Sequence, residues 1–132
     1  IYGSSRYVEQ HGRLTCVEDL KDHALVGLDD SMSNHRAAVW LRRVAPSGQV
    51  VARNNSILGL VYSAKAGLGL APLPTAIADA ESDLVRVLGP IDELTRIWRV
   101  LAAPDKRHTP RVAAFFDFVV DEIESLRPII TG

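Results

Sequence analysis

The sequence is nearly free of cysteine: Cys16 is the only one among 132 residues, so no internal disulfide can form. A chain without disulfides suits a reducing compartment, and we expect a cytoplasmic location. Long apolar runs are also missing, since none approaches the roughly 20 residues that cross a bilayer. The first ten residues, IYGSSRYVEQ, contain neither the basic segment nor the apolar core of a signal peptide. The sequence therefore predicts a protein that makes no use of a membrane.

An excess of positive charge is missing as well. Fifteen basic residues face sixteen acidic ones, and the net charge is -1 at pH 7. Nucleic-acid-binding surfaces normally carry a clear positive excess, so this segment is not expected to bind DNA itself. The last amphipathic segment is also a poor recognition helix, because its polar face is acidic. Its acidic residues are Asp117, Asp121, Glu122 and Glu124.

Motifs of catalysis and cofactor binding are missing too. The sequence Gly67-Leu68-Gly69 lacks the third glycine and the strand-before-helix context of a dinucleotide site. No Gly-x-Ser-x-Gly elbow occurs, and Cys16 has no adjacent histidine that would activate it as a nucleophile. The histidines, none of which has the spacing of metal ligands, are His11, His23, His35 and His108. We therefore predict no cofactor, no metal and no enzymatic activity.

The composition that is present is that of a soluble globular domain, with 47% hydrophobic and 23% charged residues. The length fits one domain or part of a larger one. Strand and helix patterns alternate along the chain, which is typical of the α/β class. The predicted strands cover residues 24–28, 49–53, 68–71, 84–88 and 96–103.

Helix starts are the clearest local signals. Ser4 is positioned to cap a helix that runs to His11 and stops at Gly12. Thr15 and Glu18 form a capping-box pattern ahead of one helical turn. The other predicted helices are 35–44, capped by Ser33 or Asn34 and with a strand as the alternative; 57–66, capped by Asn54-Asn55-Ser56; and 75–80.

A closing helix is predicted to open at Thr109-Pro110, because proline is favoured at the first helical position. An apolar stripe with helical spacing runs along it and is expected to be buried. The residues of this stripe are Val112, Phe116, Val119, Ile123 and Leu126.

Several segments carry a resemblance to a known family. Residues 17–20, VEDL, follow the first helix as an "xxDL" turn, and residues 54–66 form a helix that begins with asparagine. Residues 66–74, AGLGLAPLP, match the pattern "aGlGia-lP", and residues 109–118, TPRVAAFFDF, match "sp-rvraFidf". In this order and spacing, the segments resemble the C-terminal part of the effector-binding domain of LysR-type transcriptional regulators.

The resemblance implies an α/β, type II periplasmic-binding-protein-like fold with two Rossmann-like lobes, here incomplete. Residues 1–78 would form the second lobe, and residues 79–132 the return crossover and the C-terminal part of the first lobe. Because the chain starts with isoleucine, we expect it to begin within a longer protein, which we favour, or to follow processing. The resemblance implies a winged helix-turn-helix upstream. The resemblance also implies a homodimer or homotetramer that contacts DNA only through that upstream module.

A ligand site between the lobes follows from the same resemblance. Helix starts suit an anion there, because their free amides and partial positive charge point one way. Arg53 directly precedes one such start and is positioned to clamp a carboxylate. The predicted ligand-binding residues are Ser4, Ser5, Ser33, Asn34, Arg53, Asn54, Asn55, Ser56 and Leu73. The alternative is an ordinary cap at each helix start, and a solvated basic face for Arg42 and Arg43.

Two functions fit this pattern. The leading hypothesis is the ligand-sensing part of a transcription regulator, which binds a small anionic organic molecule and makes or breaks no bond. The alternative is a solute-binding module of a transport system with the same fold. An upstream winged helix would favour regulation, and a signal peptide would favour transport.

Overall fold

A computed structural model describes residues 1–131 of the 132-residue chain. Contacts within the chain define two compact units, Ile1–Thr95 and Arg96–Gly132. The predicted division at residue 78 concerns two lobes of a larger assembly, and it stays a prediction.

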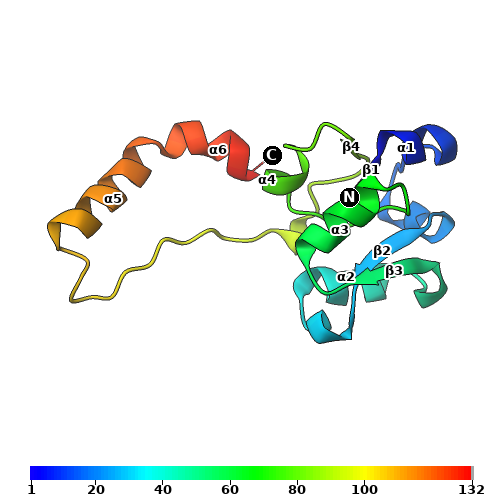
Figure 1. The fold of residues 1–132 in the computed structure, drawn as a ribbon, viewed down its shortest axis with the longest axis horizontal. Coiled ribbons are helices and arrows are strands. Elements are labelled where there is room, and N and C mark those ends of the chain that lie inside the picture. Colours follow the sequence, from blue (N-terminus) through cyan, green and yellow to red (C-terminus); the bar gives the residue numbers. More distant parts are fainter. Residues whose placement is uncertain (132) are drawn as a thin grey trace. The chain divides into compact units, whose positions relative to one another are not determined.

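The first unit alternates short strands and helices (Figure 1). Its strands are β1 (Tyr2–Ser4), β2 (Leu25–Leu28), β3 (Val50–Asn54) and β4 (Leu84–Arg86). Its α-helices are α1 (Ser5–His11), α2 (Arg36–Val44), α3 (Ile57–Lys65) and α4 (Thr75–Ala78). Short 3-10 segments are η1 (Val17–Asp22), η2 (Asp30–Met32), η3 (Ser47–Gln49) and η4 (Asp92–Leu94). This alternation confirms a mixed α/β class, built on small sheets.

Strand direction decides which loops meet. β2 pairs in parallel with β3, whereas β1 pairs antiparallel with β4. Leu70 and Ala71 link the two pairs, because Leu70 bridges in parallel to Leu25 and Ala71 bridges antiparallel to Tyr2. β1 therefore runs opposite to β2 and β3. The loops that follow β2 and β3 share one edge of the layer, and the end of β1 lies at the other edge.

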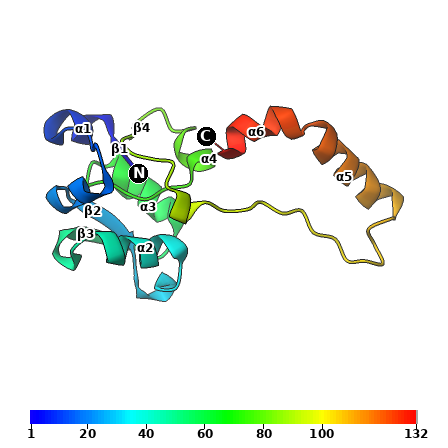
Figure 2. The ribbon, with the colours of Figure 1, turned by 180° about the vertical axis from the view of Figure 1, so that it is seen from behind.

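β2 is the central strand of the first unit. Helices α2 and α3 both pack on it, and Figures 1 and 2 show it beside β3. Val26 of β2 and Leu60 of α3 share one core cluster and have no exposed surface. The neighbouring Leu25 belongs to a second cluster, together with Trp40 of α2. Successive side chains of a strand point to opposite faces, so β2 is buried on both, as is usual for a parallel strand covered by helices.

The capping box before η1 is shifted by one residue from its predicted position. Cys16, and not Thr15, is the residue that precedes the first turn, and Asp19, and not Glu18, closes the box. The Asp19 carboxylate accepts hydrogen bonds from the amides of Thr15 and Cys16, at 2.8 and 3.1 Å. Glu18 and Asp19 are neighbouring acids with similar capping ability, and only the path of the backbone selects between them.

The helical interpretation of residues 35–44 is confirmed, but the predicted cap is wrong. α2 begins after His35, whose ring Nδ1 lies 3.3 Å from the Ala37 amide that it caps. Ser33 and Asn34 lie further upstream. A cap is set by whichever polar atom reaches a free amide of the first turn, and histidine does so here.

The predicted strand at residues 68–71 is reduced to two bridging residues. Leu70 donates its amide hydrogen to Ala24 O at 2.8 Å, and Ala71 donates to Tyr2 O at 2.8 Å. The preceding Gly67 and Gly69 have positive φ values of 77° and 159°. Because this conformation interrupts an extended run, pairing starts only after Gly69.

The segment 96–103 was also predicted as a strand, and this prediction is wrong. It pairs with no strand of the described residues, and Trp98 is 68% exposed. Alternating apolar residues identify a segment that is able to form a strand. The ladder itself requires the backbone groups of a neighbouring strand.

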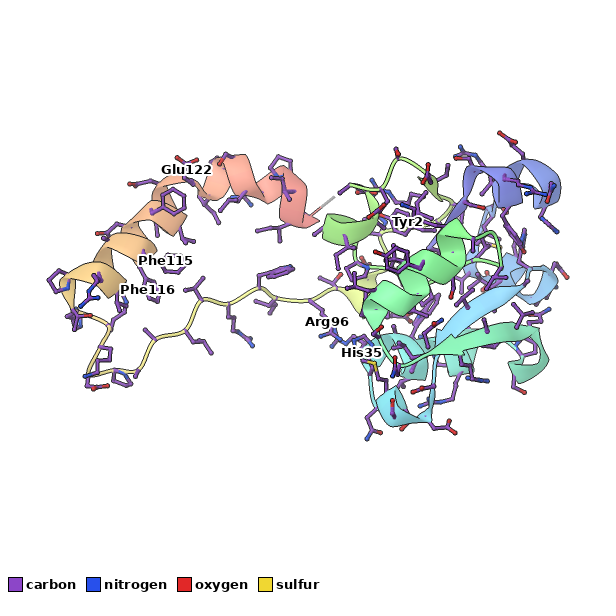
Figure 3. The ribbon with its side chains drawn as sticks, in the orientation of Figure 1. Tyr2, His35, Arg96, Phe115, Phe116 and Glu122 are labelled. Carbon is purple, nitrogen blue, oxygen red and sulfur yellow. The ribbon has the colours of Figure 1, made fainter. Side chains whose placement is uncertain are left out.

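The predicted closing helix is two helices in the second unit. Thr109 and Pro110 open α5 (Pro110–Asp121) as predicted, but the helix ends at Glu122, and α6 (Ile123–Thr131) follows. No residue of α5 or α6 is buried within the described part of the chain, so the predicted burial of the apolar stripe does not occur there. Figure 3 shows Phe115 and Phe116 of α5, whose rings meet edge to face at 6.3 Å between centroids.

Candidate functional site

The carboxyl ends of β2 and β3 form the best candidate site in the first unit. The two strands are parallel, so the loops after Leu28 and Asn54 start side by side. The Asp29 amide donates to the Asn54 carbonyl oxygen at 2.9 Å and joins the loops where they leave the strands. Ligands of open α/β sheets bind outside the carboxyl ends of their strands. We call this place the carboxyl edge: residues 29–35, which follow β2, and residues 54–56, which comprise the last residue of β3 and the two after it.

Helix α3 starts at the carboxyl edge. Ser56 caps it, with its hydroxyl oxygen accepting from the Gly59 amide at 3.1 Å. Asn55 and Ser56 are both exposed, whereas Asn54 is half-buried. Asn54 Nδ2 donates to the Ser63 hydroxyl at 3.1 Å, so its side chain is held against α3. Asn55 and Ser56 are therefore exposed at the start of α3, and Asn54 fixes the loop that carries them.

Helix α2 also starts at the carboxyl edge, at His35, which Figure 3 labels. Two contacts shape the loop before it. The Asp29 carboxylate accepts from the Ser31 amide at 3.0 Å and from the Ser31 hydroxyl at 2.6 Å. Arg42 Nη2 donates to the Ser33 carbonyl oxygen at 2.7 Å. Ser33 is half-buried and Asn34 is exposed, so this loop presents polar groups beside those of α3.

The predicted residues Ser4 and Ser5 lie at the other edge of the strand layer. Ser4 is 5% exposed, and its hydroxyl oxygen accepts from the Tyr7 amide at 3.2 Å as the cap of α1. The Ser5 amide donates to the Asp83 carbonyl oxygen at 3.2 Å. Tyr7 then ties α1 to the start of β2, because its hydroxyl oxygen accepts from the Ala24 amide at 2.9 Å. The structure therefore does not bring Ser4 and Ser5 together with the carboxyl edge.

Arg53 and Asn54 are neighbours in sequence but project to opposite faces of β3. Arg53 is paired with Gly27, which faces α2: a Cβ on Gly27 would lie 3.3 Å from Leu41 Cδ2. Asn54 faces α3 through its bond to Ser63. Leu73 is 9% exposed and packs in the core with Leu28 and Leu60. Leu73 therefore supports the carboxyl edge from inside the core.

The structure also reveals a polar cluster that the sequence did not indicate. Trp40 Nε1 donates to the Glu93 carboxylate at 2.6 Å, and Arg43 forms an ion pair with the same carboxylate at 2.8 Å. Hydrogen bonds from Arg43 and from Trp40 lower the pKa of Glu93. Arg36 donates to the Thr95 carbonyl oxygen. Helix α2 thus holds η4 and Thr95, the last residues of the first unit. About fifty residues separate the partners, so no local pattern could have found them.

Comparisons with known proteins identify the family. The first unit is an α/β module whose polar groups gather at a carboxyl edge, an arrangement suited to binding small molecules. Residues 2–124 match the LysR substrate binding domain, so the chain belongs to that family. It is an effector-binding domain of a LysR-type transcriptional regulator, a regulatory and non-enzymatic class, and the family implies a periplasmic-binding-protein-like fold. The search of curated proteins and the search of solved structures found no match.

The prediction of this family from the sequence is confirmed. None of the helices in residues 1–131 is both long and apolar enough to cross a membrane.

Proposed function

We propose that this chain senses a small organic anion at its carboxyl edge and passes the binding signal to a winged helix-turn-helix of the same protein. The observation that carries the proposal is the common origin of α2 and α3, which both start at that edge. Each helix has nine residues, long enough for a partial positive charge to develop at its start. The proposed binding groups are the first-turn amides other than the capped amides of Ala37 and Gly59, and the polar groups of Ser33, Asn34, Asn55 and Ser56.

The two helix starts favour an anion at the carboxyl edge, which also carries the carboxylates of Asp29 and Asp30. Backbone amides of a first helical turn have no partner inside the helix and point towards a bound anion. The nearby Asp29 carboxylate accepts hydrogen bonds from the Ser31 amide and the Ser31 hydroxyl, and these bonds stabilise its negative charge without a cation. No nucleophile or acid-base pair lies among the proposed groups, so binding takes place without bond formation.

Coupling to DNA requires the rest of the protein. In this proposal residues 1–78 form one lobe and residues 79–132 return to the other, with the ligand between them. A ligand that prefers one arrangement of the lobes shifts the population towards it. A homodimer or homotetramer would pass this shift to the DNA-binding modules. The family assignment supports regulation, and nothing in it supports the alternative of transport.

Ser56→Ala in the full-length protein is expected to weaken ligand binding more than folding. The substitution removes a hydroxyl from the site and loosens the first turn of α3. We expect about a tenfold loss of affinity (~1.4 kcal/mol) and a loss of folding stability of about 1 kcal/mol or less. A thermal-shift screen of small mono- and dicarboxylates supplies the ligand, and calorimetry of the best acid measures affinity.

Ser4→Ala is the matched variant, because Ser4 is also a helix cap but lies at the other edge. It is expected to lower the melting temperature and leave the affinity for the acid unchanged. If Ser56→Ala changes only thermal stability, Ser56 is a plain cap. If Ser4→Ala is the variant that loses affinity, the ligand binds at the other edge.

Residues 1–132 alone are expected not to bind promoter DNA specifically, whereas the full-length protein binds it. Specific complexes neutralise several phosphates with Lys or Arg, and this chain has a net charge of -1. Titration of both proteins against the same promoter fragment at physiological salt measures the difference. Tight, sequence-specific binding by residues 1–132 would overturn this division of roles, and binding by neither protein would count against regulation.

A further inference from the structure

We propose that the first unit has a second small-molecule site, on the α2 face of β2 and β3, that takes an aliphatic carboxylate. A groove of about 330 Å³ runs between α2 and these strands. We call it the α2 groove; the residues that line it include Leu41, Arg42, Ala45, Ser47, Val50 and Arg53. A volume of this size lies at the lower end of the range for ligand sites, roughly 300–1,000 Å³. It therefore suits a small organic acid.

The walls of the α2 groove are aliphatic. Leu41 of α2 and Ala45, the residue after the helix, line the groove together with Val50 of β3. All three belong to or pack against the same core cluster, so the walls are rigid parts of the fold. Gly27 lies between Leu41 and Val50: a Cβ there would lie 3.2 Å from Val50 Cγ1 and 3.3 Å from Leu41 Cδ2. An apolar chain is the natural occupant of such a slot, because it removes aliphatic surface from water.

The charge of the α2 groove is positive. Arg42 and Arg53 line it, and none of its lining residues is acidic. Arg42 is held in place by its bond to the Ser33 carbonyl oxygen at 2.7 Å, and a guanidinium has further N–H groups available. Arg53 makes no ion pair with an acidic side chain of residues 1–131. Guanidinium groups prefer carboxylates, which they bind through two parallel N–H bonds.

The α2 groove touches the carboxyl edge through the bond from Arg42 to the Ser33 carbonyl oxygen, but the two places use different side chains. Arg53 projects to the α2 face of β3, whereas Asn54 projects to the α3 face and bonds to Ser63. Ser56 caps α3 and is not part of the groove lining. The site in the α2 groove therefore depends on Arg53 and not on Ser56, and variants of these two residues distinguish it from the proposed effector site.

Hexanoate is the probe, and 1-hexanol is its neutral counterpart with the same chain length. Equilibrium dialysis with labelled hexanoate is performed on the full-length protein and on Arg53→Met, which keeps an apolar stem but removes the charge. We expect saturable hexanoate binding, weakened at least tenfold in Arg53→Met, and much weaker retention of 1-hexanol. Arg53→Lys should recover part of the affinity, because it restores the charge without the planar fork.

Two further variants complete the test. Ser47→Phe places a ring at an exposed position of the groove lining and is expected to reduce hexanoate binding while the carboxyl edge is unchanged. Ser56→Ala is expected to leave hexanoate binding unchanged. The melting temperature of Arg53→Met should equal that of the wild type, since Arg53 is exposed.

The absence of saturable binding at millimolar hexanoate overturns the proposal. Equal hexanoate binding by the wild type and Arg53→Met also overturns it. A loss of hexanoate binding in Ser56→Ala alone overturns it as well, because the carboxylate would then bind at the carboxyl edge. The two proposals can fail separately. If no acid binds in a way that depends on Ser56 while hexanoate binding depends on Arg53, the proposed effector site at the carboxyl edge is wrong and the site in the α2 groove is supported.

Discussion

Replacing Gly69 by alanine is expected to destabilise the first unit by about 3 kcal/mol or more, at or beyond the upper end of the usual range for a single substitution. A Cβ at this position would lie 2.7 Å from the carbonyl carbon of Ala24 and closer still to its oxygen. Both are backbone atoms at the start of β2, so no side chain can turn aside to relieve the clash. The same Ala24 oxygen accepts from the Leu70 amide at 2.8 Å, the bond that links the two strand pairs.

Urea denaturation followed by circular dichroism measures this loss, and Gly48→Ala is the matched control. Gly48 lies in the exposed η3 turn, where a Cβ would meet no atom within 4 Å. We expect that control to change stability by less than about 1 kcal/mol. Similar stabilities for the two variants would contradict the close backbone approach at Gly69.

Removing the indole of Trp40 by Trp40→Ala is expected to cost about 3–5 kcal/mol, the usual range for a large buried aromatic residue. Trp40 is 3% exposed and packs with Leu25 and Leu41 in the core. The substitution also removes the 2.6 Å hydrogen bond to Glu93. Helix α2 would then lose a principal attachment of η4, the segment that precedes the exit of the chain from the first unit.

Two measurements test the role of Trp40. Thermal unfolding gives the stability loss, and limited trypsin digestion after Arg96 and Arg99 reports how firmly η4 is held. Glu93→Gln is the comparison, because the amide oxygen still accepts from Trp40 and only the exposed pair with Arg43 is lost, at a cost of about 1 kcal/mol or less. Trypsin cleavage that is no faster in Trp40→Ala than in Glu93→Gln would show that the indole does not secure η4.

Hydrogen-bonding signals between residues close in sequence predicted the positions of most elements of the first unit. The serine cap before α1, the glycine after it, and the Asn-Asn-Ser start of α3 each act through groups within a few residues of one another. The class of fold and the family follow from the order of such signals. Which of several neighbouring polar residues caps a helix could not be predicted from the sequence. His35 and Asp19 act where Asn34 and Glu18 were expected, because backbone direction decides which polar atom reaches an amide.

The sequence by itself determined the α/β alternation, the starts of α1, α3 and α5, and the family, because these depend on groups within a few residues of one another. Tertiary structure alone decided the direction of β1, which separates Ser4 from Ser56, and the face of β3 from which Arg53 projects. It also decided the contact between Trp40 and Glu93 and the absence of strand pairing at 96–103 in residues 1–131. Each of these depends on partners far apart in the chain, and a periodic pattern identifies a buried face without identifying what covers it.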